Sequence, residues 1–176
     1  MNSIDIFVQN YFSLVHTLVL TKFMLIMTNL FEVVPLVLIT FFIAILIYYK
    51  KGLRDDLLFI ISLGMGEVFV FVFKNFFDIS RPLNGLVVET SKSFPSGHAT
   101  AVTIFFVMLM YLFAKDMNKV WRTVFVVFCV LMITLVSVSR LYLGVHWLSD
   151  VLGGVALGLF VSYISVAIFN KLYKKI

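Results

Sequence analysis

Long apolar runs dominate this chain, and charged residues bound each of them. Five runs reach or approach the length of a membrane span, namely Leu30–Tyr49, Leu57–Phe77, Ala99–Ala114, Val120–Ser139 and Trp147–Phe169. The hydrocarbon core of a bilayer is about 30 Å thick, so a helix needs roughly 20 apolar residues to cross it. The pattern therefore predicts an all-α fold, a polytopic transmembrane helix bundle with five spans.

The first 29 residues form a less uniform segment. Its apolar positions are interrupted by polar side chains, which are Asp5, Gln9, Asn10, His16 and Lys22. Such a mixture is typical of an amphipathic helix that lies in the membrane interface. We expect residues 1–29 to form an N-terminal interfacial helix and residues 30–170 to form the transmembrane core of a single domain covering 1–176. The alternative is a sixth span over Ile4–Asn29.

The overall composition excludes most soluble classes of protein. Of 176 residues, 62% are hydrophobic and 13% are charged, whereas ordinary soluble domains are about 45–50% apolar and about 25% charged. A chain of this size cannot hide so much apolar surface from water. A soluble enzyme and a disordered chain are thereby excluded. The lone Cys129 also excludes a disulfide-stapled module and a cysteine metal site.

The 14 lysine and arginine residues divide between the two sides of a five-span bundle. Nine lie on one side: Lys50, Lys51, Arg54, Lys115, Lys119, Arg122, Lys171, Lys174 and Lys175. Five lie on the other: Lys22, Lys74, Arg81, Lys92 and Arg140. Because cytoplasmic loops carry the excess of positive charge, we expect a multi-pass protein of the cytoplasmic membrane with a cytoplasmic C-terminus. The segments 74–98 and 140–146 then face outward together. The cations gather on no exposed basic face, so nucleic acid is not an expected partner.

Three cations stand out in the outward-facing segments. Lys74, Arg81 and Arg140 lie at or near the edges of apolar runs, where an uncompensated charge is costly and usually functional. Convergent cations suit a multiply charged anion, and the planar guanidinium fork of arginine matches phosphate. These residues therefore indicate a phosphate-binding site at the outer membrane face.

Two histidines lie in the same segments. Ser96, Gly97 and His98 stand where a helix is expected to begin, and the free N–H groups of a helix start bind anions. His146 and Asp150 are four residues apart and share one helix face. A carboxylate behind an imidazole fixes its tautomer and leaves the other ring nitrogen free as a nucleophile or base. The anion site thus gains groups capable of catalysis.

At these residues the chain resembles the type 2 phosphatidic acid phosphatase superfamily. The family has three signatures, KxxxxxxRP, PSGH and SRxxxxxHxxxD. They are matched here by Lys74–Pro82, Pro95–His98 and Ser139–Asp150, with every spacing kept. The resemblance covers roughly Leu30–Phe169. It implies a membrane lipid phosphatase that works without a metal ion or any other cofactor.

The resemblance also implies a role for each site residue. His146 would attack phosphorus as the nucleophile, oriented by Asp150, and would form a phosphohistidine. His98 would protonate the leaving oxygen and later act as the base for the attacking water. The phosphate oxygens would be held by Lys74, Arg81, Ser96, Gly97 (through its N–H) and Arg140.

The expected substrate is a lipid phosphate that arrives through the bilayer. Candidates are undecaprenyl diphosphate, phosphatidylglycerophosphate, phosphatidic acid and lipid A 1-phosphate, which all present phosphate at the headgroup level. Two alternatives stay open. One is a lipid phosphotransferase that uses the same intermediate, and the other is a non-catalytic membrane protein that only binds a lipid or anion. The sequence predicts neither the particular lipid nor the oligomeric state.

Overall fold

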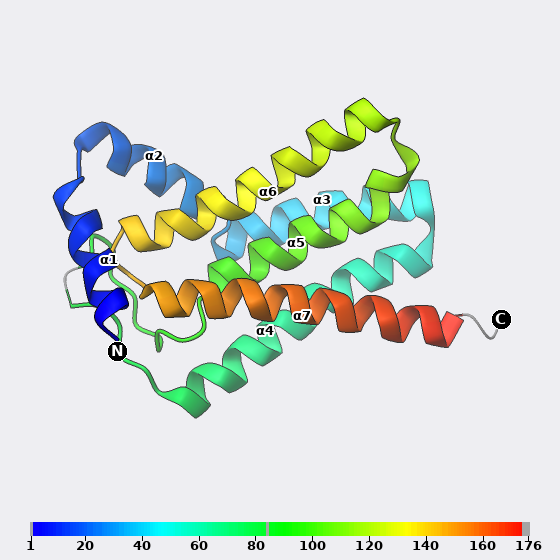
Figure 1. Cartoon of the computed structure of the whole chain (residues 1–176). Helices are drawn as coiled ribbons and strands as arrows, with labels where there is room; N and C mark the ends of the chain where they lie inside the picture. Colours follow the sequence, from blue (N-terminus) through cyan, green and yellow to red (C-terminus); the bar gives the residue numbers. More distant parts are fainter. Residues whose placement is uncertain (1, 84, 174–176) are drawn as a thin grey trace.

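The computed structural model describes residues 2–83 and 85–173, and the elements found there are helical. Figure 1 shows α1 (Ser3–Leu14), α2 (Leu18–Asn29), α3 (Val33–Lys51), α4 (Leu53–Phe77), α5 (Gly97–Phe113), the short 3-10 helix η1 (Ala114–Asp116), α6 (Lys119–Tyr142) and α7 (Leu148–Tyr173). Within this part of the chain, five helices are long and apolar enough to cross a membrane: α3, α4, α5 with η1, α6 and α7. The predicted five-span bundle is confirmed. Lys174 and Lys175 of the predicted cation set lie outside the described residues.

The N-terminal segment forms two helices, α1 and α2, where the sequence predicts one. Each has its own start signal: the side chain of Asn2 accepts from the Asp5 N–H at 2.8 Å, and that of Thr17 accepts from the Leu20 N–H at 3.3 Å. Each has 12 residues and is about 18 Å long, shorter than the hydrocarbon core of a bilayer. Neither α1 nor α2 therefore forms a sixth span.

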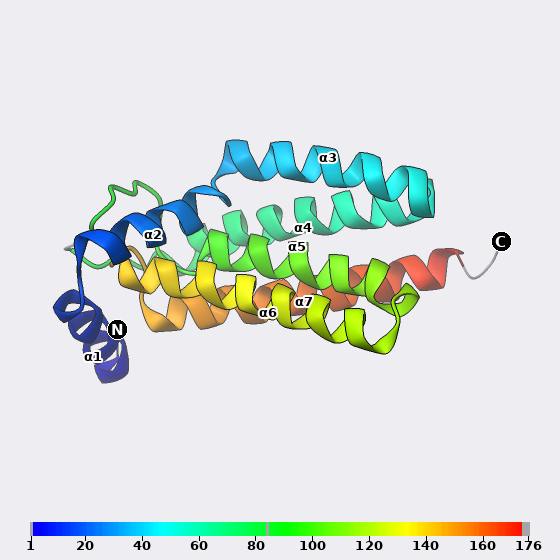
Figure 2. The ribbon, with the colours of Figure 1, turned by 90° about the horizontal axis from the view of Figure 1, so that it is seen from above.

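The spanning helices alternate in direction, so their connections gather at two ends of the bundle (Figures 1 and 2). One end holds the segment 78–96 between α4 and α5, the turn 143–147 between α6 and α7, and helix α1. The opposite end holds the turn at Gly52, whose φ of +91° favours glycine, and the connection from α5 to α6. The three sequence motifs meet at the first end because each begins or ends a span there.

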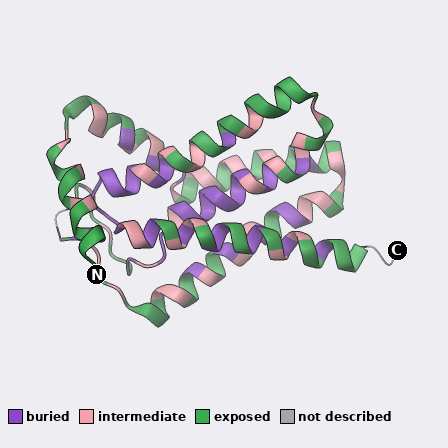
Figure 3. Ribbon diagram, in the orientation of Figure 1, coloured by how far each residue is buried: buried purple, intermediate pink, exposed green. Residues whose placement is uncertain are grey.

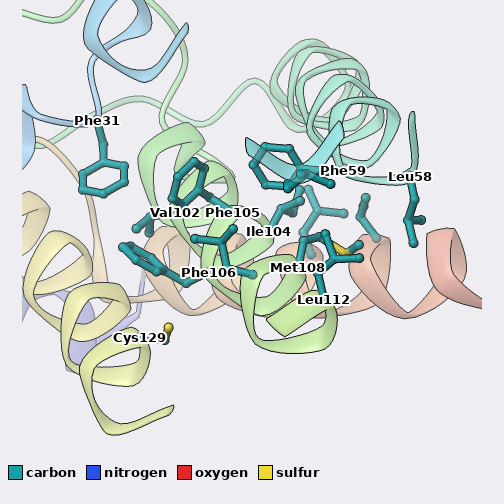
Figure 4. Close-up of a cluster of buried hydrophobic side chains, with 14 of the residues drawn as sticks. Phe31, Leu58, Phe59, Val102, Ile104, Phe105, Phe106, Met108, Leu112 and Cys129 are labelled. Atoms are coloured by element: carbon teal, nitrogen blue, oxygen red, sulfur yellow. The ribbon is translucent and has the colours of Figure 1, made fainter. Parts of the chain in front are cut away.

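Helix α5 is the centre of the bundle. It packs against α4, α6 and α7, and Figure 3 shows that most of its residues are buried. Its Phe105 lies edge-on to Phe31 and Phe59, with ring centroids 6.2 and 5.6 Å apart (Figure 4). Lipid tails are as apolar as these side chains, so close packing rather than exclusion of water holds such helices together.

Two glycines let α7 approach α5 closely. A Cβ at Gly154 would lie 2.6 Å from the carbonyl oxygen of Ser96, and a Cβ at Gly158 would lie 2.6 Å from the Cβ of Thr103. Small residues let helix backbones approach in this way inside membranes. The contact places the start of α5 beside the start of α7, which brings the second and third motifs together.

We expect Gly154→Ala to lower the free energy of unfolding by about 1–3 kcal/mol, because the added methyl group pushes α5 and α7 apart. The matched control is Gly64→Ala in α4, where a Cβ would meet nothing within 4 Å. Alanine there should leave stability unchanged or slightly raised, since glycine is unfavourable inside a helix. Thermal unfolding in detergent measures both variants, and equal unfolding temperatures would contradict the close packing of α7 on α5.

Candidate active site

His146 and Asp150 form a buried pair at the junction of α6 and α7. Nδ1 of His146 lies 3.3 Å from Oδ2 of Asp150. The same oxygen accepts from the backbone N–H of Trp147 at 2.8 Å and from the hydroxyl of Ser93. A carboxylate acceptor favours the imidazole tautomer with hydrogen on Nδ1, so Nε2 keeps its lone pair.

The lone-pair nitrogen of His146 faces Arg81. Nη1 of Arg81 lies 3.1 Å from Nε2 of His146 and donates to the Val145 carbonyl at 2.8 Å. Nε and Nη2 of Arg81 donate to the carbonyl and hydroxyl oxygens of Ser91, at 2.7 and 3.0 Å. Burial, opposed by the hydrogen bond to Asp150 and reinforced by the guanidinium charges, lowers the pKa of His146 to about 4. The imidazole is therefore neutral at neutral pH, as a nitrogen nucleophile must be.

A second arginine lies deeper in the protein and is paired with a glutamate. Arg140 is 1% exposed; its Nη1 donates to the hydroxyl of Thr28 at 2.6 Å, and its Nη2 pairs with Glu89. The Glu89 carboxylate also lies 3.6 Å from Nη2 of Arg81. Burial alone would raise the pKa of Glu89, but the charges of Arg140 and Arg81 hold it below its usual value. An ionised carboxylate thus bridges the two arginines that are expected from the sequence to bind phosphate.

Lys74, at the end of α4, completes the cationic cluster. Its Nζ donates to the hydroxyl of Ser91 at 3.0 Å and to the carbonyl of Lys92 at 2.5 Å. Ser91 is therefore shared by Lys74 and Arg81 and draws both cations toward one point. Asp78, inside the first motif, pairs with Lys92.

The start of α5 forms another side of the site. Ser96 is buried and caps the helix, because its hydroxyl accepts from the Ala99 N–H at 3.4 Å. Gly97 is the first helical residue, and a Cβ there would meet only Val70, at 3.7 Å. Other side chains do not crowd this stretch of backbone, and the N-terminal end of a helix carries partial positive charge. An anion placed beside Gly97 would be stabilised.

A cavity of about 740 Å³ joins these groups to the space between α3 and α4. Its polar end is lined by Glu32, Lys74, Arg81, Glu89, Ser91, Gly97, His98, Arg140 and His146. There, Nε2 of His98 lies 3.2 Å from Oε1 of Glu32 without forming a hydrogen bond to it. The remaining wall is mostly apolar and includes Leu36, Val37, Phe41, Ile60, Leu63 and Phe71. Such a cavity suits an amphiphile with an anionic head and an apolar tail.

Six of the eight sequence-predicted site residues line this cavity: Lys74, Arg81, Gly97, His98, Arg140 and His146. The other two, Ser96 and Asp150, are buried behind it. The sequence motifs did not point to Glu89 or Ser93, although both contact motif residues. One signal was available, since Glu89 is the sole carboxylate between Arg81 and His98 in the chain.

The model of the PAP2 superfamily matches residues 56–174 of this chain, which include all three motifs. The chain belongs to the PAP2 superfamily. The resemblance drawn from the motifs is confirmed. The match to the PAP2 model begins inside α4, so α1, α2 and α3 lie outside it.

Two relatives are similar to this chain over about two thirds of its length. The chain is 35% identical to a phosphatidylglycerophosphatase B of Bacillus subtilis (strain 168) over 121 residues, which is 66% of this chain and 59% of that protein. It is 34% identical to an undecaprenyl-diphosphatase of Sulfolobus acidocaldarius over 132 residues, which is 71% of this chain and 60% of that protein. The chain thus spans about three fifths of the length of these relatives.

A solved structure shares the fold over nearly the whole chain. The crystal structure of a transmembrane PAP2-type phosphatidylglycerolphosphate phosphatase from Bacillus subtilis matches with a TM-score of 0.87 and 27% sequence identity. The match covers 95% of this chain and 85% of that one. Together with the apolar helices, this likeness identifies a multi-pass membrane protein with the PAP2 fold.

We expect Glu89→Gln to tighten the binding of orthovanadate, a phosphate analogue, by about tenfold. The neutral amide holds the two guanidinium groups less strongly than the carboxylate does, and a hydrogen bond to a charged group is worth about 1.5–3 kcal/mol. Binding is measured by the rise in unfolding temperature of the purified protein with vanadate concentration. The matched control is Glu67→Gln, which lines the same cavity from α4 and should leave vanadate binding unchanged. Unchanged or weaker binding by Glu89→Gln would contradict competition between Glu89 and the anion.

Proposed function

We propose that this chain is a membrane lipid phosphatase that hydrolyses a phosphomonoester or diphosphate of a lipid through a phosphohistidine, without a metal ion. One observation carries the proposal. The buried His146–Asp150 pair keeps a neutral imidazole beside a cationic cluster, at the polar end of an otherwise apolar cavity. Binding alone would need the cations; it would not need a nucleophile with a carboxylate behind it.

The placement of the side chains supports the following reaction. Nε2 of His146 attacks phosphorus while the bond to the lipid oxygen breaks, and His98 gives that oxygen a proton. Water then attacks the phosphohistidine, His98 takes a proton from it, and inorganic phosphate leaves as His146 regains its lone pair. Asp150 stabilises the positive imidazole ring during the first step.

Charge on the phosphate oxygens is balanced by the chain itself. Lys74, Arg81 and Arg140 supply three cations, and Gly97 adds its backbone N–H at the start of α5. Preorganised positive groups of this kind stabilise charge in a phosphoryl-transfer transition state, as metal ions do in other phosphatases. Ser96 is also proposed to bind the phosphate, because it lies at the start of α5. Its hydroxyl caps the same helix.

The apolar wall of the cavity supports a lipid as the substrate. It lies between α3 and α4, whose outer faces are exposed in the bundle and would meet lipid. Undecaprenyl diphosphate, phosphatidylglycerophosphate, phosphatidic acid and lipid A 1-phosphate all combine an apolar tail with an anionic head that fits this arrangement. The names of the relatives point to the same class of substrate.

We also propose the orientation of the protein in the cytoplasmic membrane. The cations Lys50, Lys51, Arg54, Lys115, Lys119 and Arg122 lie near the end of the bundle opposite the segment 78–96 and the turn 143–147. Because positive loops stay in the cytoplasm, the active site opens on the extracytoplasmic face and the C-terminus is cytoplasmic.

His146→Ala should abolish release of inorganic phosphate from every lipid phosphate while leaving the unfolding temperature near that of the wild type. The assay uses purified protein in detergent with EDTA present and a panel of the four candidate lipids. The matched control is His16→Ala, whose ring lies outside the cavity and contacts the Tyr142 carbonyl at 2.8 Å; it should keep most of the activity. Normal turnover by His146→Ala would refute the assignment of His146 as the nucleophile.

The same assay tests the two finer parts of the proposal. Activity lost in EDTA and restored by magnesium would contradict metal independence. If the phosphoryl group is transferred to a second lipid and not to water, the chain is a phosphotransferase.

Activity should have a bell-shaped dependence on pH. His146 must be neutral to attack, and its pKa of about 4 means that the acid limb appears only as the pH falls through about 4. His98 must carry a proton to act as the acid, and the negative charge of a bound phosphate favours the protonated ring. The alkaline limb is therefore that of the enzyme–substrate complex, in which activity falls as His98 loses its proton. The measurements are kcat/KM for the acid limb and kcat for the alkaline limb, between about pH 3.5 and 9 with one lipid phosphate. An acid limb near 6.5, the ordinary histidine value, would contradict a buried neutral His146.

A further inference from the structure

Helix α2 reaches the active site although it precedes the region that matches the PAP2 model. It packs against the C-terminal end of α6, which carries Arg140 and Tyr142 (Figure 2). Met24 and Thr28, one turn apart, form its buried face. Leu18, Val19 and Ile26 are exposed on its other side and would meet lipid. This amphipathic arrangement presents Thr28 to α6 close to the motif residue Arg140.

The Thr28 hydroxyl is the acceptor for one corner of the Arg140 guanidinium. Nη1 donates to Thr28 at 2.6 Å, and both side chains are almost fully buried. Nη2 pairs with Glu89, while Nε is buried and finds no partner among the described residues. Nε and Nη2 form one edge of the planar guanidinium, the edge that binds two oxygens of a phosphate side by side. That edge therefore has an acceptor at Nη2, which is Glu89, and none among the described residues at Nε.

We propose that Thr28 is a positioning residue that aims the Nε–Nη2 edge of Arg140 at the substrate phosphate; this rests on the phosphate role proposed for Arg140. A guanidinium is a rigid plane, so holding Nη1 fixes the direction of the other two nitrogens. The hydroxyl does this without a charge of its own. Thr28 therefore orients Arg140 without reducing its positive charge, whereas a second carboxylate at position 28, in addition to Glu89, would reduce it further.

Helix α2 is itself fixed by a second hydroxyl contact. The Thr21 hydroxyl lies 2.9 Å from the hydroxyl of Tyr142, which also accepts from the Thr17 N–H at 3.1 Å. Thr21 and Thr28 are thus alike in residue type, helix and partner element. Thr28 is buried and Thr21 is half-buried, and only Thr28 contacts the arginine that is proposed to bind phosphate. This difference supplies a matched control.

The experiment compares Thr28→Val, Thr28→Ser and Thr21→Val in the purified full chain in detergent. Short-chain phosphatidic acid is the substrate and orthovanadate is the inhibitor. Thr28→Val keeps the shape of threonine and loses the acceptor, so kcat/KM and vanadate affinity should each fall about tenfold, the loss expected for one hydrogen bond to a charged group. Thr28→Ser restores the hydroxyl and should stay within about twofold of the wild type. Thr21→Val should also stay within about twofold. If Thr28→Val does not fold, Thr28→Ala replaces it with the same expectation.

Two results would overturn the proposal. One is wild-type kcat/KM and vanadate affinity in Thr28→Val. The other is an equal loss in Thr21→Val, which would show that the loss comes from the packing of α2. Arg140→Lys is measured in parallel. If Arg140→Lys is inactive and Thr28→Val keeps wild-type kcat/KM and vanadate affinity, the role of Thr28 fails alone. If Arg140→Lys is fully active, the proposed phosphate role of Arg140 fails, and the role of Thr28 fails with it.

Discussion

Buried positive charge is the constraint on which the rest of this structure depends. Arg140, Arg81 and Lys74 place three cations at the end of an apolar bundle, where unpaired charge is costly. The charge is balanced by the Glu89 carboxylate and by hydroxyl and carbonyl oxygens, most of which come from the segment 78–96. That segment has no regular secondary structure in its described residues. Its hydrogen bonds and its ion pair to these cations hold the segment in place.

Asp150 sets the complementary constraint, a carboxylate buried at the start of α7. Its Oδ2 accepts from Trp147, Ser93 and His146, and the helix start adds favourable partial charge. The donors belong to the turn after α6 and to the segment before α5. The contacts that stabilise this one charge therefore also align the segments that carry the two histidines. The Asp150 carbonyl, which accepts from the Ser96 N–H at 3.0 Å, joins α5 to the same point.

The sequence was informative where a general physical rule acts on a continuous stretch. A bilayer imposes length and apolar character on each span, and the predicted span Leu57–Phe77 ends at the same residue as α4. The motif spacings likewise placed six predicted residues around one cavity. Contacts between distant segments could not be predicted. The division of the N-terminal segment depends on Thr17 and on its bond to Tyr142, 125 residues away, and the place of Glu89 depends on Arg140, 51 residues away.

The acceptors around the cations fall into two kinds with different consequences for binding. Thr28, Ser91 and the carbonyl oxygens are neutral, so they orient the cations without reducing their charge. Glu89 reduces that charge, and under the proposed function a phosphate must take its place between Arg81 and Arg140. A phosphomonoester with two negative charges gains attraction in this exchange. A phosphodiester carries one negative charge, the same as Glu89, and gains none. The ordinary diester phospholipids that fill a bilayer would therefore compete poorly for a site that Glu89 already occupies.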